Sequence, residues 1–125
     1  MKKFLTLEQM TALMNFGIDV SPKCTGMIYS AVEGEYKLMY SDAVCEDDII
    51  AFDLQDINEL LPKEICGAYL SLELDYCSIE YYYIDYGERI SWKSIDFNIE
   101  EIIDACYEML LWVIENGYLK QSKMY

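Results

Sequence analysis

Carboxylates are the first candidates for chemistry in this chain, which has 23 Asp and Glu residues and no histidine. Glu46, Asp47 and Asp48 follow one another directly, and Asp53 lies a few residues further on. Carboxylates at this density could hold a hard cation, but their order lacks the spaced ligands and the central glycine of a calcium loop. We therefore interpret the segment as a solvated acidic loop and expect no metal site.

Tyrosines are the second candidates, because a tyrosine combines a large apolar body with a polar tip that suits a binding surface. The chain has 12 of them, and Tyr81, Tyr82 and Tyr83 stand in a row with Tyr86 beyond. Side chains alternate along a strand, so Tyr81 and Tyr83 should share one face and Tyr82 and Tyr86 the other. If helices cover one face of the sheet only, one of these pairs stays exposed, which predicts a contact surface.

The sequence contains no motif of the common enzyme classes. It has no nucleophile elbow, no glycine-rich phosphate loop and no paired metal-ligand motif. We therefore expect a protein that is not an enzyme and needs no cofactor, with a small acidic enzyme or ligand-binding domain as the alternative. Long, irregular spacings predict free thiols rather than a disulfide framework or a zinc site for the five cysteines Cys24, Cys45, Cys66, Cys77 and Cys106.

The charge balance indicates which partners to expect. With 9 Lys and Arg the formal net charge is −14, so direct binding to nucleic acid or to an anionic membrane is disfavoured by like-charge repulsion. A protein partner with a basic surface would be attracted, although the acidity is also explained by solubility alone. No stretch approaches the length of a membrane span, the N-terminus does not read as a signal peptide, and we expect a cytoplasmic protein.

The longest helix signal runs from Asn98 to Gly117. Asn98 can cap the helix, Glu101 stands where a capping box places an acid, and Gly117 can provide a left-handed stop. Leu111 and Trp112 widen the apolar arc, so this helix either is buried on more than one side or offers this edge to a partner. One face should be buried, formed by Ile99, Ile102, Ile103, Cys106, Met109, Leu110, Val113 and Ile114.

The remaining elements follow from caps, turns and alternation. Thr6 and Gln9 form a capping-box pattern for a first helix over 6–16. A second helix should begin after its cap at Asp53 and end at Pro62. Clean alternation over 69–76 predicts that Leu70, Leu72 and Leu74 share a core with Ile102, Cys106, Met109 and Val113. Glycines mark the turns of two hairpins, and a short apolar run over 49–52 precedes the second helix. The strand segments are 27–32, 36–40, 69–76, 79–86 and 89–95.

These elements predict the fold class. The order α-β-β-α-β-β-β-α is typical of an α+β protein in which helices cover one face of an antiparallel sheet, here of about five strands. At 125 residues, the chain suits one domain over 1–125.

Four segments of the sequence carry a resemblance. TLEQM and GIDVS near the start, FDLQDINELLPKEI in the middle and DACYEMLLWVIENGYL at the end resemble a family of small uncharacterised proteins encoded by prophages and mobile elements of gut Bacteroidales. The family has no assigned activity, so no functional residue carries over. The resemblance implies a phage or mobile-element origin, and such genomes often encode small acidic proteins that disable host defence proteins, some by imitating the charge of DNA.

Together these observations lead to one expected function and two alternatives. We expect a small acidic, non-catalytic protein-binding module, in its sharpest form an inhibitor that presents acidic groups to a nucleic-acid-binding defence protein. The alternatives are a small acidic enzyme or ligand-binding domain, and a structural homo-oligomer joined through exposed apolar surface on the last helix. The candidate partner-binding residues are Glu46, Asp47, Asp48, Tyr81, Tyr82, Tyr83, Tyr86, Leu111 and Trp112.

Overall fold

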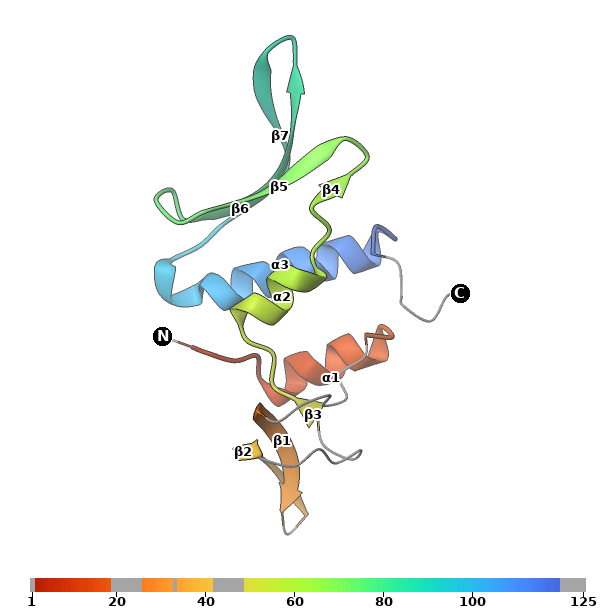
Figure 1. The fold of residues 1–125 in the computed structure, drawn as a ribbon, viewed down its shortest axis with the longest axis vertical. Helices are drawn as coiled ribbons and strands as arrows, with labels where there is room; N and C mark the ends of the chain where they lie inside the picture. Colours follow the sequence, from red (N-terminus) through yellow and green to blue (C-terminus); the bar gives the residue numbers. More distant parts are fainter. Residues whose placement is uncertain (1, 19–25, 33, 42–48, 120–125) are drawn as a thin grey trace. The chain divides into compact units, whose positions relative to one another are not determined.

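A computed structural model of the 125-residue chain describes residues 2–18, 26–32, 34–41 and 49–119. The α+β class predicted from the sequence is confirmed, and the predicted order of elements is recovered apart from the two-residue strands β3 and β4. The elements, shown in Figure 1, are α1 (Leu7–Asn15), β1 (Gly26–Val32), β2 (Glu35–Ser41), β3 (Ile49–Ile50), α2 (Leu54–Leu60), β4 (Glu64–Ile65), β5 (Ala68–Glu73), β6 (Ser78–Asp85), β7 (Glu88–Asp96), the 3₁₀ turn η1 (Ile99–Glu101) and α3 (Ile102–Glu115).

The strands form two antiparallel sheets, where the sequence predicted a single sheet. One has the order β2-β1-β3 and the other β4-β5-β6-β7. The short strand β3 pairs with β1 at Ile28 and Tyr29, so the edge of β1 that faces away from β2 is already occupied there. The chain accordingly divides into two compact units, Phe4–Asp53 and Met1–Lys3 with Leu54–Tyr125. Organisation as a single domain stays a prediction.

In the first unit, local signals fix helix α1 at both ends. The Thr6 hydroxyl accepts from the Gln9 backbone N–H at 3.2 Å, and the Gln9 side chain accepts from the Thr6 N–H at 2.9 Å, so the predicted capping box is confirmed. After the helix, Gly17 has φ +92° and donates to Met14, while the Ile18 N–H donates to Leu13. These two bonds form a Schellman motif, which satisfies carbonyl groups at the helix end.

The hairpin of β1 and β2 is also confirmed, with Gly34 at φ +85° in its turn. Next to it, the Tyr29 hydroxyl donates to the carbonyl of Leu5 at 2.6 Å. The Leu5 N–H in turn donates to the carbonyl of Phe52 at 2.9 Å. These bonds tie the segment before α1 to the sheet of this unit.

In the second unit, α2 and α3 pack against each other, and α3 also contacts β6 and β7 (Figure 1). Helix α3 begins later than predicted, because Asn98 donates its side-chain amide to the Glu101 carboxylate at 3.0 Å and caps no backbone group. Its predicted end is confirmed: Gly117, at φ +75°, donates to Ile114 and Tyr118 donates to Val113 in a second Schellman motif.

The buried face of α3 largely matches the predicted stripe. Ile102, Cys106, Met109 and Val113 are buried, as are Ile79 and Tyr81 of β6. Leu74 was predicted to join them, and that prediction is wrong, because β5 ends at Glu73 and leaves Leu74 in the following loop with 56% of its surface exposed. Leu70 and Leu72 remain half-buried.

Burial of Cys106 predicts a loss of stability at alkaline pH. Desolvation raises the pKa of this thiol from its ordinary value of 9.0 to about 11, so the folded state keeps a proton that the unfolded chain releases. The stabilising contribution is complete below about pH 9 and is lost as pH rises toward about 11, on the order of 2 kcal/mol in all. Urea melts across this range should show a shallower decline for Cys106→Ala than for the wild type. Parallel declines would contradict the assignment, because Tyr81, whose pKa burial also raises, titrates in both proteins.

Candidate interaction surface

The hairpin of β6 and β7 continues beyond the sheet. Pairing between β5 and β6 ends at Tyr69 and Tyr82, whereas β6 and β7 stay paired through Tyr83 to Ile90. Residues 83–90 therefore form a two-stranded projection, which we call the arm, and Figure 1 shows it extending past the start of β5. A projection of this kind offers its side chains to a partner on more than one side.

Tyr86 and Gly87 make the turn at the tip of the arm, with φ +49° and φ +79°. Two residues with positive φ between paired Asp85 and Glu88 are typical of a type I′ hairpin turn, in which Asn, Asp and Gly are the favoured residues. A bulky side chain at positive φ is disfavoured. Tyr86 is nevertheless 99% exposed, so packing within the protein does not explain its presence.

Further exposed side chains adjoin this tip. Ile84 is 58% exposed, and Tyr83 is exposed too. The acids Asp85 and Glu88 are exposed on either side of the turn. The arm thus combines an apolar and aromatic tip with negative charge at its flanks.

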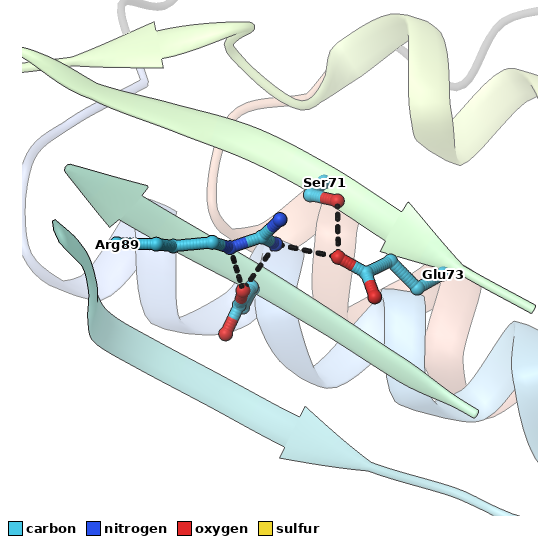
Figure 2. Close-up of polar contacts among 4 residues, drawn as sticks. Ser71, Glu73 and Arg89 are labelled. Carbon is cyan, nitrogen blue, oxygen red and sulfur yellow. Dashed lines mark hydrogen bonds and ion pairs between the residues drawn. The ribbon is translucent and has the colours of Figure 1, made fainter. Parts of the chain in front are cut away.

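Arg89 lies opposite Ile84 in the arm, and two carboxylates of the sheet hold its guanidinium. Its Nε donates to Glu80 at 2.9 Å, and its Nη2 donates to Glu73 at 2.6 Å and also contacts Glu80. Ser71 donates to the same Glu73 oxygen at 3.2 Å (Figure 2). These bonds join β5, β6 and β7, and hydrogen bonding to Glu80 and then Glu73 raises the pKa of Arg89.

The bonds of Arg89 also determine where the positive charge of β7 lies. The Arg89 guanidinium covers the Tyr82 ring at 3.9 Å and is directed to Glu73 and Glu80 rather than to the tip. Lys93, the other cation that could begin a basic groove, has its Nζ 6.0 Å from the centre of the Trp112 ring. The two positive side chains of β7 are therefore engaged within the protein, which disfavours a nucleic-acid groove along this strand.

The predicted tyrosine pairs are only partly recovered. Tyr81 is fully buried and its hydroxyl donates to the carbonyl of Pro62 at 2.8 Å, so the prediction that it contacts a partner is wrong. Tyr82 is half-buried beneath Arg89. Tyr83 and Tyr86 are the exposed pair. They come from a strand and a turn, because alternation along β6 ends at Asp85.

A β-bulge explains how β7 differs from simple alternation. Lys93 lies opposite Tyr81 and Ser91 lies opposite Tyr82, which leaves Trp92 as the extra residue. Trp92 meets Trp112 edge to face, with ring centres 5.3 Å apart. The bulge thereby places the Trp92 indole against the Trp112 indole of α3.

For Trp112 and Leu111 the sequence left two interpretations open, burial on a second side of the last helix or contact with a partner. Both are half-buried, and the Trp112 ring contacts Tyr81, Trp92 and Tyr118 at centre distances of 6.0, 5.3 and 5.4 Å. Aromatic packing inside this unit thus accounts for the wide apolar arc of α3. Trp92, which the sequence did not single out, is the exposed member of the cluster.

The acidic loop predicted as a partner-binding site, Glu46, Asp47 and Asp48, lies outside the described residues. Within the described part of the chain, no group of three or more His, Cys, Asp or Glu side chains is placed to hold a metal ion. Three described cysteines are free thiols, of which Cys66 is exposed, Cys77 half-buried and Cys106 buried. No helix among the described residues is long and apolar enough to cross a membrane.

Sequence reasoning missed Ile84 as part of the arm, and it missed the bonds of Arg89 and the bulge at Trp92 in the sheet next to the arm. The Tyr86-Gly87 dipeptide between two strand-like segments was the sequence signal that indicated a two-residue turn.

Comparison with family models, curated proteins and solved structures gave no match to this chain. The candidate function therefore rests on the residues of the arm and on the charge of the chain.

Proposed function

We propose that this protein is a non-catalytic protein-binding module that contacts a protein partner through the arm. The observation that carries the proposal is Tyr86, a bulky residue with positive φ and a side chain that is 99% exposed. Such a conformation costs on the order of 1 to 3 kcal/mol, and no burial offsets it. Tyrosine is among the residues that dominate binding energy at protein interfaces, so a bound partner would supply the missing contacts.

Charge favours a partner with a basic rim around an apolar pocket. Asp85 and Glu88 flank the tip, and the whole chain carries a formal charge of −14. A field of this sign accelerates the approach of a positively charged protein and opposes that of nucleic acid. In this proposal Tyr86 and Ile84 enter the pocket, while the acids contact Lys and Arg at its rim.

The narrower form of the proposal is an inhibitor of a host nucleic-acid-binding defence protein, encoded by a phage or mobile element and acting in the cytoplasm. It is supported by the excess of acids and by the resemblance carried by FDLQDINELLPKEI and DACYEMLLWVIENGYL. The acidic segment Glu46 to Asp48 would add contacts that resemble those of a DNA backbone. A partner with a basic nucleic-acid-binding surface would also explain the strong excess of acidic residues in this protein.

Photo-crosslinking from the tip tests the proposal. A benzoyl-phenylalanine replaces Tyr86 in one variant and Tyr76 in the other; Tyr76 is a matched control, 78% exposed in the loop between β5 and β6. Each is irradiated in a Bacteroidales lysate. We expect a protein adduct from position 86 and little from position 76, and a nucleic-acid-binding protein in that adduct would support the inhibitor. Adducts of equal yield and identity from both positions would reject the arm as the contact surface.

A further inference from the structure

Among the described residues, no strand pairs with the outer edge of β2 in the other sheet. In the order β2-β1-β3, β2 is an outer strand, and it pairs with β1 over all seven residues from Glu35 to Ser41. One edge of the strand therefore presents backbone N–H and C=O groups that another strand could pair with. An open edge of this length is a site of association unless side chains prevent it.

The side chains of β2 do not protect this edge from association. Tyr36, Leu38 and Tyr40 alternate along the strand and so share one face of the sheet, with between 43% and 67% of each side chain exposed. They lie opposite Ala31, Tyr29 and Met27 of β1. Protective edges usually carry charge or proline; the two charged residues of this strand, Glu35 and Lys37, both belong to the opposite face.

We propose that β2 pairs in antiparallel orientation with β2 of a second copy of this chain, around a two-fold axis at Leu38. In this register Leu38 faces Leu38 of the second copy, and Tyr36 faces its Tyr40. The exposed apolar face then continues without interruption across the axis. All seven residues of each strand find an opposite residue, and the two three-stranded sheets become one of six strands.

Neighbouring registers that keep the same faces together are less favourable. An axis at Lys37 sets the two Lys37 side chains directly opposite each other, and like charges in that position are destabilising. An axis at Met39 moves Tyr36 beyond the end of the opposing strand. The register centred on Leu38 instead sets Lys37 opposite Met39 of the second copy, so the local charges of β2 select it.

The interface is small, and this sets its strength. The exposed parts of these three side chains amount to about 300 Å² per copy, given that an aromatic side chain buries about 150 to 250 Å² in full, and pairing at the edge covers at most that area because the face of the sheet stays open. Stable complexes bury about 800 Å² per partner, so we infer a weak, concentration-dependent dimer. Each copy carries a charge of −14, and salt should therefore strengthen the dimer by screening their repulsion. A basic partner held by the arm would show the opposite response to salt.

Sedimentation equilibrium tests the dimer from about 5 to about 500 μM, at ionic strengths of about 0.05 and about 0.5 M. The wild type should gain weight-average mass with concentration, more so at the higher salt. Leu38→Lys and Tyr40→Lys should stay monomeric with unchanged circular dichroism. Ile84→Lys places the same charge on the arm and should dimerise normally. A monomeric wild type throughout, or equal association of the β2 variants and the wild type, would overturn the proposal.

Disulfide trapping tests the register independently. The background replaces Cys24, Cys45, Cys66 and Cys77 with serine and retains the buried Cys106. Leu38→Cys should form a covalent dimer on mild oxidation, because residues directly opposite in an antiparallel pair have Cα atoms about 4.5 to 5.5 Å apart, within reach of a disulfide. Tyr36→Cys faces position 40 and should not crosslink to itself. Equal crosslinking by the two variants, or none by Leu38→Cys, would overturn the register.

Discussion

Replacing Met109 with alanine is expected to lower the free energy of unfolding by about 2 to 5 kcal/mol. Met109 is fully buried on α3, the helix that contacts α2, β6 and β7. Alanine removes apolar contacts there and leaves a cavity that the surrounding side chains can only partly fill. Urea or guanidinium melts of the two proteins measure the loss directly.

Glu108 provides the control for this measurement. It precedes Met109 on the same helix but is exposed, so Glu108→Ala should change the free energy of unfolding by less than about 0.5 kcal/mol. If the Met109 and Glu108 variants unfolded at the same denaturant concentration, the buried face assigned to α3 would be wrong.

Features set by nearby residues were predictable from the sequence. The Thr6 and Gln9 capping box needs only side chains three residues apart, and the stop at Gly117 needs a residue that accepts positive φ. Amphipathic spacing likewise identified Met109 and Val113 as buried. In each case the residues that give the signal and the feature that they determine lie within one or two helical turns of each other. Contacts with distant parts of the chain therefore have little influence on these features.

Features that depend on strand pairing were not predictable in the same way. The first sheet is completed by the two-residue strand β3, which pairs with β1, and so short a segment gives no alternation to detect. Alternation continues in the sequence through Leu74 and Tyr76, but β5 ends at Glu73 and both residues fall in a loop. Periodicity therefore predicts which side a residue takes on a strand, while the end of the strand depends on its partner.

The candidate site shows the same division. A tyrosine-rich contact surface was predicted, and Tyr83 and Tyr86 are exposed. Tyr81 is instead a core residue, since the Trp112 ring of α3 packs against it and the carbonyl of Pro62 accepts a hydrogen bond from its hydroxyl. The bonds of Arg89 to Glu73 and Glu80 join residues of three strands, and only the paired register brings them together.

Loss of the exposed apolar pair on the arm should have the largest effect on binding. Ile84→Ser with Tyr86→Ser removes a 58% exposed aliphatic and a 99% exposed aromatic side chain. A hot-spot side chain at an interface contributes about 2 kcal/mol or more, so if even one of the two is a hot spot, the double variant loses about 30-fold or more in affinity. The stability of the module should hardly change, because neither side chain packs in the core.

The matched control lies at the opposite end of β6. Leu74→Ser with Tyr76→Ser also removes one aliphatic and one aromatic side chain, 56% and 78% exposed, from the loop between β5 and β6. This pair equals the arm pair in chemistry and resembles it in exposure. If surface hydrophobicity in general supported binding, both variants would lose affinity alike. If the interface is at the arm, only the Ile84/Tyr86 variant should lose affinity.

Quantitative affinity capture with these two variants and the wild type is the most direct measurement of the arm as a binding surface. Equal amounts of each protein serve as bait in one Bacteroidales lysate, and mass spectrometry compares the recovered proteins. We predict a specific partner that the wild type and the Leu74/Tyr76 variant recover equally, and that the Ile84/Tyr86 variant loses by about 30-fold or more. Equal recovery by all three baits, or a selective loss with the Leu74/Tyr76 variant, would contradict binding through the arm.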